Sequence, residues 1–176
     1  NILTDTNMIK IVGEYLGTEP YLNHTDVWWD RYMDGTLRDS QEFHFDGEDP
    51  LMVKIFFYLT DVSEKDGPII YLGKTNKFIK KIGLIYHHGI HGISDSDLSS
   101  KTLSNVKTLV GKSGDIIFAD TNGFHKGGIV SSNSLGRILF TLTFVSKWPT
   151  ADPPDDKLLP FISASELLSG GYRNYL

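Results

Sequence analysis

The chain has 176 residues, a formal net charge of -5 and no cysteine. This length predicts one domain, and a composition that is 40% hydrophobic and 12% aromatic is typical of a globular protein rather than a disordered one. The absence of cysteine excludes disulfides, thiolate metal sites and a cysteine nucleophile, which leaves histidine, aspartate and glutamate as the strong metal ligands.

The charge and the hydropathy also restrict the partners. A net charge of -5 argues against nucleic acid as the main partner, because phosphate neutralisation needs clustered lysine and arginine. The lysine-rich run KTNKFIKK (74–81) is interpreted as a solvated loop. No apolar run of about 18 residues occurs, so no membrane span is expected, and the first residues lack the apolar region of a signal peptide. We expect a small-molecule substrate.

The predicted elements begin with a helix. Residues 5–16, DTNMIKIVGEYL, place apolar side chains at helical spacing, and Gly17 suits a left-handed helix end. From about residue 26 onward, short β-type runs alternate with turn signals, as in sandwiches and barrels. The predicted strands are QEFHFD (41–46), MVKIFFYLTDV (52–62), PIIYLG (68–73), TLVGK (108–112), DIIFAD (115–120), GGIVSS (127–132) and RILFTLTFVS (137–146).

Residues 74–107 interrupt these strands. A loop of this length is typical of a lid or a binding loop, and we expect it over the mouth of a β-barrel. SASELL (163–168) is predicted to form a short helix, because Ser163 and Glu166 have the spacing of a capping box. The sequence shows no internal repeat and predicts a single domain (1–176) with an N-terminal helix (5–16), a core (about 27–146) and a C-terminal tail (149–176).

Two predicted strands have one apolar face and one mixed face, because side chains alternate along a strand. In VKIFFYLT, the apolar face holds Val53, Ile55, Phe57 and Leu59, and the mixed face holds Lys54, Phe56, Tyr58 and Thr60. In RILFTLTF, the mixed face holds Arg137, Leu139, Thr141 and Thr143. Antiparallel sheets ordinarily turn a mixed face to water. Phe56 and Tyr58 are costly to expose, however, and aromatic walls with a few cations suit a pocket for a small anion between the sheets of a jelly roll.

The stretch SQEFHFDGED (40–49) contains the first candidate metal ligands. His44 and Asp46 share one face of the predicted strand, although a lone His-x-Asp is a weak signal. His125 follows 81 residues later, in a glycine-flanked turn. Two histidines and one carboxylate are the ligand set of non-haem Fe(II) oxygenases. Arg137 lies twelve residues further on, where a guanidinium can bind a dicarboxylate through two hydrogen bonds.

These segments together resemble the phytanoyl-CoA dioxygenase family of Fe(II)/2-oxoglutarate-dependent oxygenases. The resemblance covers about residues 27–146 and rests on HFDGED, KIFFYLTDVSEKDGPIIYLGKTNK, GDIIFADTNGFHKGG and Arg137. It implies an all-β core, a double-stranded β-helix of the jelly-roll or cupin type with flanking short helices. It further implies that 2-oxoglutarate and O2 are co-substrates of a hydroxylation that releases succinate and CO2, that Arg137 holds the distal carboxylate, and that Fe(II) is held by the catalytic residues His44, Asp46 and His125.

Three more residues of the mixed face are candidates for the co-substrate site. Lys54 and Tyr58 can donate hydrogen bonds to a co-substrate carboxylate, and Phe56 can form a wall of the same pocket. Fe(II) chemistry and the absence of cysteine fit a cytoplasmic location.

The chain departs from the family pattern after DGPIIYLG, where the family usually has Ser-His and this chain has Lys74 and Thr75. This difference affects the expected surroundings of the metal ligands or the substrate contacts, and it does not affect the expected metal ligands. Some relatives are halogenases, in which a small residue replaces the carboxylate ligand. Because Asp46 is present here, hydroxylation or a related oxidation is expected.

The remaining histidines and the tryptophans are not assigned to the metal site, and the histidines of HHGIH are expected to face the substrate or the solvent. HHGIH (87–91) offers two histidines four residues apart, a spacing that binds metal on a helix, but the glycines in this segment favour a lid loop. His24 is interpreted as a structural residue. Trp28 and Trp29 are interpreted as packing residues, of which one can border the pocket.

Two other functions stay open at this point. A cupin-like metal enzyme that does not use 2-oxoglutarate would have no need for the cation at Arg137. A non-catalytic jelly-roll binding module would turn His44 and Asp46 to solvent and would leave the spacing of the four residues to chance.

Overall fold

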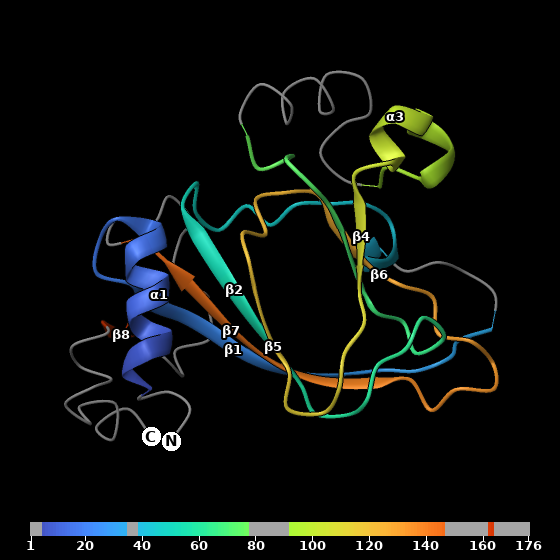
Figure 1. The fold of residues 1–176 in the computed structure, drawn as a ribbon, viewed down its shortest axis with the longest axis horizontal. Coiled ribbons are helices and arrows are strands. Elements are labelled where there is room, and N and C mark those ends of the chain that lie inside the picture. The colour runs from blue at the N-terminus through green and yellow to red at the C-terminus, as the bar shows by residue number, and fades with distance from the viewer. Residues whose placement is uncertain (1–4, 35–38, 78–91, 147–161, 164–176) are drawn as a thin grey trace.

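The computed structural model describes residues 5–34, 39–77, 92–146 and 162–163. The elements of this part of the chain, most of them labelled in Figure 1, are α1 (Thr6–Leu16), β1 (Tyr21–Asp30), η2 (Asp39–Gln41), β2 (Met52–Tyr58), β3 (Ile69–Leu72), η3 (Asp95–Asp97), α3 (Ser100–Leu103), β4 (Val106–Leu109), β5 (Ile116–Ala119), β6 (His125–Gly127), β7 (Arg137–Val145) and β8 (Ile162–Ser163). Of these, η2 and η3 are single 3-10 turns.

The strands form two antiparallel sheets. The larger sheet has the strand order β5-β2-β7-β1-β8, and the smaller sheet has the order β4-β3-β6. In Figure 1 the long strands β2, β7 and β1 run beside one another, with β4 and β6 together in the other half of the molecule. Two antiparallel sheets with few helices confirm the predicted all-β core.

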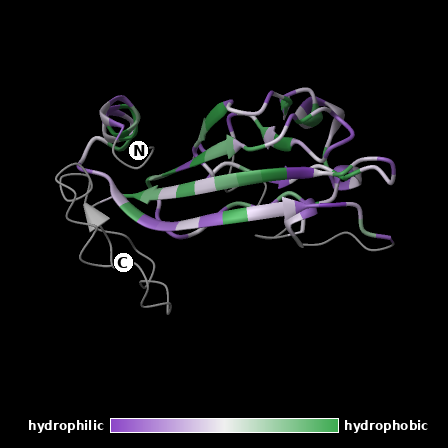
Figure 2. Ribbon diagram, turned by 90° about the horizontal axis from the view of Figure 1, so that it is seen from below, coloured by the Kyte–Doolittle hydropathy of each residue, from purple (hydrophilic) through white to green (hydrophobic). Residues whose placement is uncertain are grey.

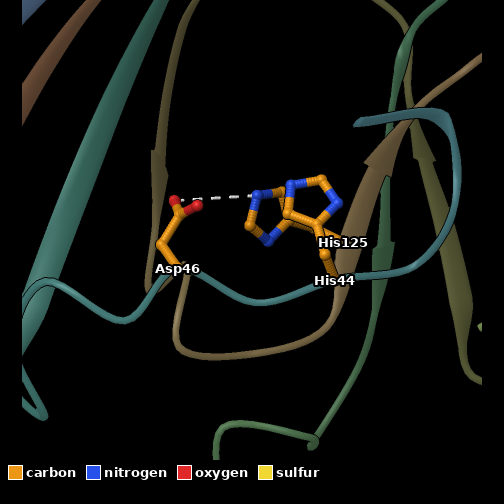
Figure 3. Close-up of side chains that lie close together, drawn as sticks. All are labelled: His44, Asp46 and His125. Atoms are coloured by element: carbon orange, nitrogen blue, oxygen red, sulfur yellow. Dashed lines mark ion pairs between the residues drawn. The ribbon is translucent and has the colours of Figure 1, made fainter. Parts of the chain in front are cut away.

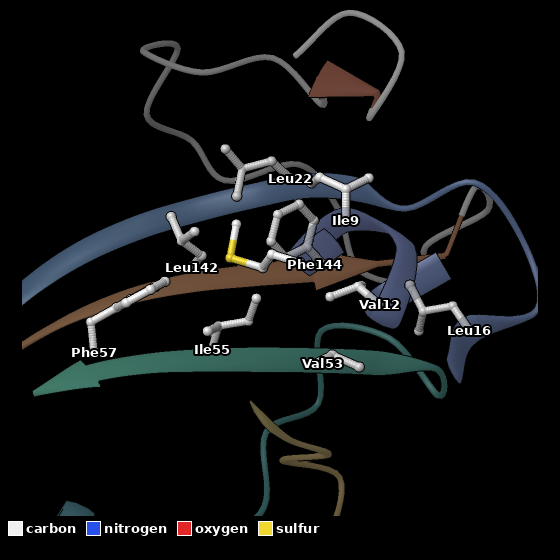
Figure 4. Close-up of a cluster of buried hydrophobic side chains, with 10 residues drawn as sticks. Ile9, Val12, Leu16, Leu22, Val53, Ile55, Phe57, Leu142 and Phe144 are labelled. Atoms are coloured by element: carbon white, nitrogen blue, oxygen red, sulfur yellow. The ribbon is translucent and has the colours of Figure 1, made fainter. Parts of the chain in front are cut away.

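The N-terminal helix is confirmed, and it covers one face of the larger sheet. The side chain of Asp5 accepts a hydrogen bond from the backbone N–H of Met8 at 2.9 Å, and Gly17 ends the helix with a φ of 66°. The apolar side of the helix packs on one end of this face and shields it from water (Figure 4), whereas Val27, Ile116 and Phe118 further along the same face remain exposed. The cluster contains Met8, Ile9, Val12, Leu16, Leu22, Val53, Ile55, Phe57, Leu142 and Phe144.

The opposite face of the larger sheet is turned toward the smaller sheet. Figure 2 shows the alternation behind this arrangement as bands of hydrophobic and hydrophilic residues along the long strands. The apolar residues of β2 pack under α1, whereas Lys54 and Phe56 line a cavity on the other side. The predicted division of β2 into two faces is therefore confirmed within the strand. Leu59 departs from it, because β2 ends at Tyr58 and the Leu59 side chain is 49% exposed.

Two predicted strands are wrong in position. Residues 41–46 form no strand, because their backbone pairs only through isolated bridges at Phe43 and His44. Of the run predicted at 127–132, only Gly127 belongs to a strand, which lies earlier, at β6, and Val130 forms an isolated bridge with Asp66. The N–H of Gly128 still donates to the carbonyl of Pro68 at 2.7 Å, but Pro68 has no N–H to donate in return, so the ladder ends there.

None of the predicted strands corresponds to β1 (Tyr21–Asp30). Its sequence, YLNHTDVWWD, has no strict alternation of apolar and polar residues. Its ten residues nevertheless pair with β7 along almost their full length, with a register shift between Leu22 and His24. Pairing with the long strand β7 therefore makes this segment a strand, although its own sequence pattern does not indicate one.

Several predictions concern residues beyond the described ranges. The HHGIH segment (87–91) and most of the predicted helix at 163–168 lie outside them, and Ser163 itself belongs to β8. Of the predicted lid (74–107), the described part contains the short elements η3 and α3 before β4. Within the described residues, no helix combines the length and the apolar character needed to cross a membrane.

Two isoleucines of α1 provide a matched test of this packing. The Ile9 side chain is 6% exposed and belongs to the core cluster, whereas the Ile11 side chain is 50% exposed. We expect Ile9→Ala to lower the free energy of unfolding by about 2–5 kcal/mol. Ile11→Ala should lower it by about 1 kcal/mol at most. Urea denaturation followed by circular dichroism measures both values, and equal losses would show that α1 does not dock by this face.

Candidate metal centre

Three side chains from two distant segments converge in the structure (Figure 3). One ligand atom each from His44, Asp46 and His125 lies within 4.8 Å of the other two. The two imidazole centroids are 4.5 Å apart, and Nε2 of His125 lies 3.7 Å from Oδ2 of Asp46. The three predicted metal ligands therefore surround one point in space.

Backbone hydrogen bonds hold the two segments in this position. The N–H of His44 donates to the carbonyl of His125 at 3.0 Å, and the N–H of His125 donates to the carbonyl of His44 at 2.8 Å. The N–H of Asp46 donates to the carbonyl of Thr121 at 2.9 Å. The segment that follows η2 is thus fastened to the loop between β5 and β6, although the two are far apart in the sequence.

Each imidazole is oriented by a carbonyl two residues earlier in the chain. Nδ1 of His44 lies 2.9 Å from the carbonyl oxygen of Glu42, and Nδ1 of His125 lies 3.0 Å from that of Gly123. With Nδ1–H donating to the carbonyl, Nε2 is left with a free lone pair, as in most metal-binding histidines. Gly123 is needed at its position, because a Cβ there would overlap the hydroxyl group of Tyr71.

The Asp46 carboxylate is paired with Lys54 across the cavity wall. Nζ of Lys54 lies 2.7 Å from Oδ2 of Asp46, and each side chain is 15% exposed. Burial by itself raises the pKa of Asp46, but the positive charge of Lys54 and hydrogen bonds from Lys54 and Thr121 outweigh it, so the pKa lies below its ordinary value. Asp46 is therefore ionised at neutral pH, which a metal ligand requires.

His125 is held in the neutral form. Burial lowers the pKa of His125 from 6.5 to about 4, although the charge of Asp46 acts in the opposite direction. A neutral imidazole is the form that donates a nitrogen lone pair to a metal. Both the carboxylate and the imidazole are thus in the protonation state that favours a cation between them.

Arg137 lies at the start of β7 and is buried, with a side chain that is 7% exposed. Its Nε donates to Oδ2 of Asp30 at 2.9 Å, and the two residues face each other across β1 and β7. Its Nη1 is buried and has no hydrogen-bond partner among the described residues. A buried guanidinium nitrogen without a partner is uncommon in folded proteins and is a donor available to an anionic ligand.

The ligand residues and Arg137 line one cavity of about 570 Å³ between the two sheets. Phe56 and Lys54 of β2 belong to its lining, as their place on the mixed face predicts. Tyr58 does not belong to the cavity lining. Its side chain is fully buried, and its hydroxyl donates a hydrogen bond to the carbonyl of Leu109 at 2.5 Å. Burial raises the pKa of Tyr58, so this hydroxyl stays protonated.

Some lining residues are missing from the sequence-based prediction of the site. Asp30, which orients Arg137, lines the cavity and was not predicted, whereas Thr141 of β7 lines it as its place on the mixed face predicts. Trp28 and Trp29 line it too, with 54% and 61% exposure, so that both border the pocket where the prediction allowed one. The alternation of VWWD places Trp28 and Asp30 on one face, a signal that becomes usable only once β1 is known to be a strand.

The loop that carries His125 has its own supports. The side chain of Asp120 accepts hydrogen bonds from the hydroxyl of Tyr15, on α1, at 2.5 Å and from the amide of Asn76 at 3.0 Å. The hydroxyl of Thr75 accepts a hydrogen bond from the N–H of Phe124 at 2.8 Å. The position at which this chain departs from the Ser-His pair of the family is thus a support of the loop.

Comparisons by sequence find no relative: no protein-family model matches the chain, and no curated protein matches it. Comparison of folds does find similar structures. The non-heme monooxygenase ThoJ in its apo form aligns with a TM-score of 0.64 and 16% identity, over 93% of this chain and 59% of ThoJ. The alpha-ketoglutarate-dependent epimerase SnoN from nogalamycin biosynthesis aligns with 0.63 and 13% identity, over 90% of this chain and 63% of SnoN.

A third similar structure is HygX from Streptomyces hygroscopicus with nickel and 2-oxoglutarate bound, with a TM-score of 0.55, 13% identity, and coverage of 84% of this chain and 66% of HygX. The chain thus spans about three fifths of the length of these proteins. At such identities the likeness shows the fold, and the predicted cupin-like double-stranded β-helix is confirmed. The narrower resemblance to the phytanoyl-CoA dioxygenase family stays a prediction.

The convergence of the three ligand residues predicts divalent metal binding. We expect the wild-type chain to bind one Ni(II) or Fe(II) ion, and we expect His44→Ala and His125→Ala each to remove this binding. His24→Ala is the matched control, because His24 does not line the cavity. Anaerobic isothermal titration calorimetry measures the affinities. Wild-type affinity in either site variant would contradict convergence on a metal.

The low pKa of His125 predicts a pH-dependent stability of the metal-free protein. Between pH 6.5 and about 4 the unfolded chain binds a proton at this residue and the folded chain does not, so stability falls as the pH falls through this window. The loss is on the order of 3 kcal/mol. His125→Asn should remove this slope, whereas the contribution of Asp46 is lost only at lower pH. Urea titrations with a chelator present measure the effect, and an unchanged slope in the variant would refute it.

Proposed function

We propose that the protein is an Fe(II)- and 2-oxoglutarate-dependent oxygenase that hydroxylates or otherwise oxidises a small molecule, with release of succinate and CO2. One observation carries the proposal. The three candidate ligands and a buried guanidinium with a free nitrogen line the same cavity, as a metal and a dicarboxylate together require.

The donor set fits iron and a bidentate 2-oxo acid. Two imidazole nitrogens and one carboxylate leave coordination positions free for a co-substrate and O2, and the two carbonyl-bound Nδ1 atoms fix the ligand tautomer. When bound, the iron and the 2-oxo acid supply the oxidising chemistry. The chain's own part is to hold the metal through His44, Asp46 and His125 and to anchor the distal carboxylate at Arg137.

Further residues prepare this site. Asp30 accepts a hydrogen bond from Nε of Arg137 and so orients the guanidinium. The Arg137 side chain therefore loses little conformational freedom when an anion binds. Phe56 and Leu139 form apolar walls, which exclude water and strengthen the charge pairing inside the cavity. Lys54 holds the carboxylate of Asp46 in position beside the two imidazoles.

The structural neighbours support the class of chemistry. SnoN is described as alpha-ketoglutarate dependent, ThoJ as a non-heme monooxygenase, and HygX binds nickel and 2-oxoglutarate. Within this class we propose a hydroxylase similar to the phytanoyl-CoA dioxygenases, because Asp46 supplies the carboxylate that halogenases lack. We also propose a small-molecule substrate, because a net charge of -5 does not suit nucleic acid, and a cytoplasmic location, because Fe(II) chemistry and the absence of cysteine fit it.

The two alternatives are less well supported. A metal enzyme without 2-oxoglutarate gives no role to the free Nη1 of Arg137 or to its pairing with Asp30. A binding module with solvent-facing residues does not fit a His125 that is 7% exposed and an Asp46 side chain that is 15% exposed.

Co-substrate turnover tests the proposal. Under anaerobic conditions, Fe(II) and 2-oxoglutarate should give the visible charge-transfer band of the chelate, and Arg137→Gln should weaken 2-oxoglutarate binding by about 10-fold or more. In air, slow succinate formation should appear in the wild type and vanish in His44→Ala. Lys112→Gln is the control, because Lys112 is an exposed cation paired with Asp61 outside the cavity. Substrate oxidation without 2-oxoglutarate would favour the cupin-like alternative.

A further inference from the structure

Thr141 is a buried polar residue that the proposed function does not yet use. Its side chain lines the cavity, the residue is 2% exposed, and its hydroxyl group has no hydrogen-bond partner among the described residues. A buried hydroxyl without a partner costs free energy, and most buried polar groups in folded proteins avoid this cost. Such a group at a cavity wall indicates a ligand that completes its hydrogen bonding.

A second unpartnered donor lies on the same strand and the same face. Arg137, four residues before Thr141 on β7, has a buried Nη1 without a partner and lines the same cavity. Residues separated by an even number share a face of a strand, so both side chains leave β7 toward the cavity. Two buried donors on one wall match a ligand with more than one acceptor group.

The register of the sheet places Thr141 along the path between Arg137 and the metal ligands. Thr141 is the cross-strand partner of Phe56, and the next residue on its face, Thr143, is the partner of Lys54. Lys54 in turn contacts Asp46. A 2-oxo dicarboxylate that extends from Arg137 toward Asp46 must therefore pass the hydroxyl group of Thr141.

We propose that the Thr141 hydroxyl donates a hydrogen bond to the 2-oxo acid co-substrate, and that Thr141 and Arg137 together form a two-donor site for an elongated dicarboxylate. This inference rests on the proposed function. It predicts effects on folding and on binding that a threonine with a purely structural role would not have. The hydroxyl destabilises the protein without co-substrate and stabilises the complex, so its removal has opposite effects on folding and on binding.

The variant Thr141→Val tests both effects, because valine keeps the branched shape and removes the hydroxyl. We expect the melting temperature of the metal-free protein to rise by about 2–4 °C. We expect the affinity for 2-oxoglutarate, measured by calorimetry on the Ni(II)-loaded protein, to fall about 10-fold. Thr141→Ser, which keeps the hydroxyl, should bind 2-oxoglutarate within about threefold of the wild type.

Thr143→Val is the matched control. Thr143 is on the same face and is fully buried, but its hydroxyl lies 3.2 Å from Nε2 of His24, and it does not line the cavity. This variant should lose about 2–4 °C of melting temperature through the lost hydrogen bond. Its affinity for 2-oxoglutarate should equal that of the wild type.

The outcomes separate this inference from the proposed function. If the Ni(II)-loaded wild type binds 2-oxoglutarate and Thr141→Val binds it equally well, the role of Thr141 is overturned and the proposed function stands. If Thr141→Val is destabilised like Thr143→Val, the hydroxyl has a partner within the protein, and the inference is wrong. If the Ni(II)-loaded wild type does not bind 2-oxoglutarate at all, both fail together.

Discussion

Two backbone hydrogen bonds between His44 and His125 hold the candidate centre together. They form an isolated antiparallel bridge between a segment without regular structure and the first residue of β6. Because paired residues of antiparallel chains project their side chains to the same side, this one bridge places both imidazoles next to each other. Asp46 follows two residues later, on the same face, and is fixed by its own bond to Thr121. The site therefore depends on backbone geometry more than on side-chain packing.

The two sheets supply the second half of the arrangement. The larger sheet buries one face against α1 and leaves the other, with Arg137 and Lys54, for the cavity. This division explains how a short chain can carry charged groups inside without unfolding. Both of these cations have a carboxylate within 3 Å, Asp30 for Arg137 and Asp46 for Lys54, so the cost of desolvation is offset before any ligand arrives.

Much of this organisation could be predicted from the sequence. Alternation along β2 and β7 separates the face under α1 from the face at the cavity, because a period of two is fixed by strand geometry. The helix at the N-terminus follows from its spacing and from Gly17. His44, Asp46 and His125 were recognisable as one set because their chemistry is rare and specific, and the structure does bring them together.

The remainder depends on pairing between distant residues, which local patterns do not encode. The segment around His44 has the composition of a strand, yet it forms only two isolated bridges, at Phe43 and His44, because no strand among the described residues offers a continuous partner. Conversely, β1 lacks a clear alternation and is ordered by β7. The contacts of Lys54 with Asp46 and of Tyr58 with Leu109 follow from these registers, so the sequence alone could place both side chains on a face but could not name their partners.

The hydrogen bond from Tyr15 to Asp120 gives α1 a second role beside that of a cover for the core. The helix lies on the far side of the larger sheet from the cavity, yet through this bond it reaches the loop that ends in His125. The helix and this loop are thus in direct contact through side chains at the edge of the larger sheet. The position of α1 therefore contributes to the position of the loop that leads to His125.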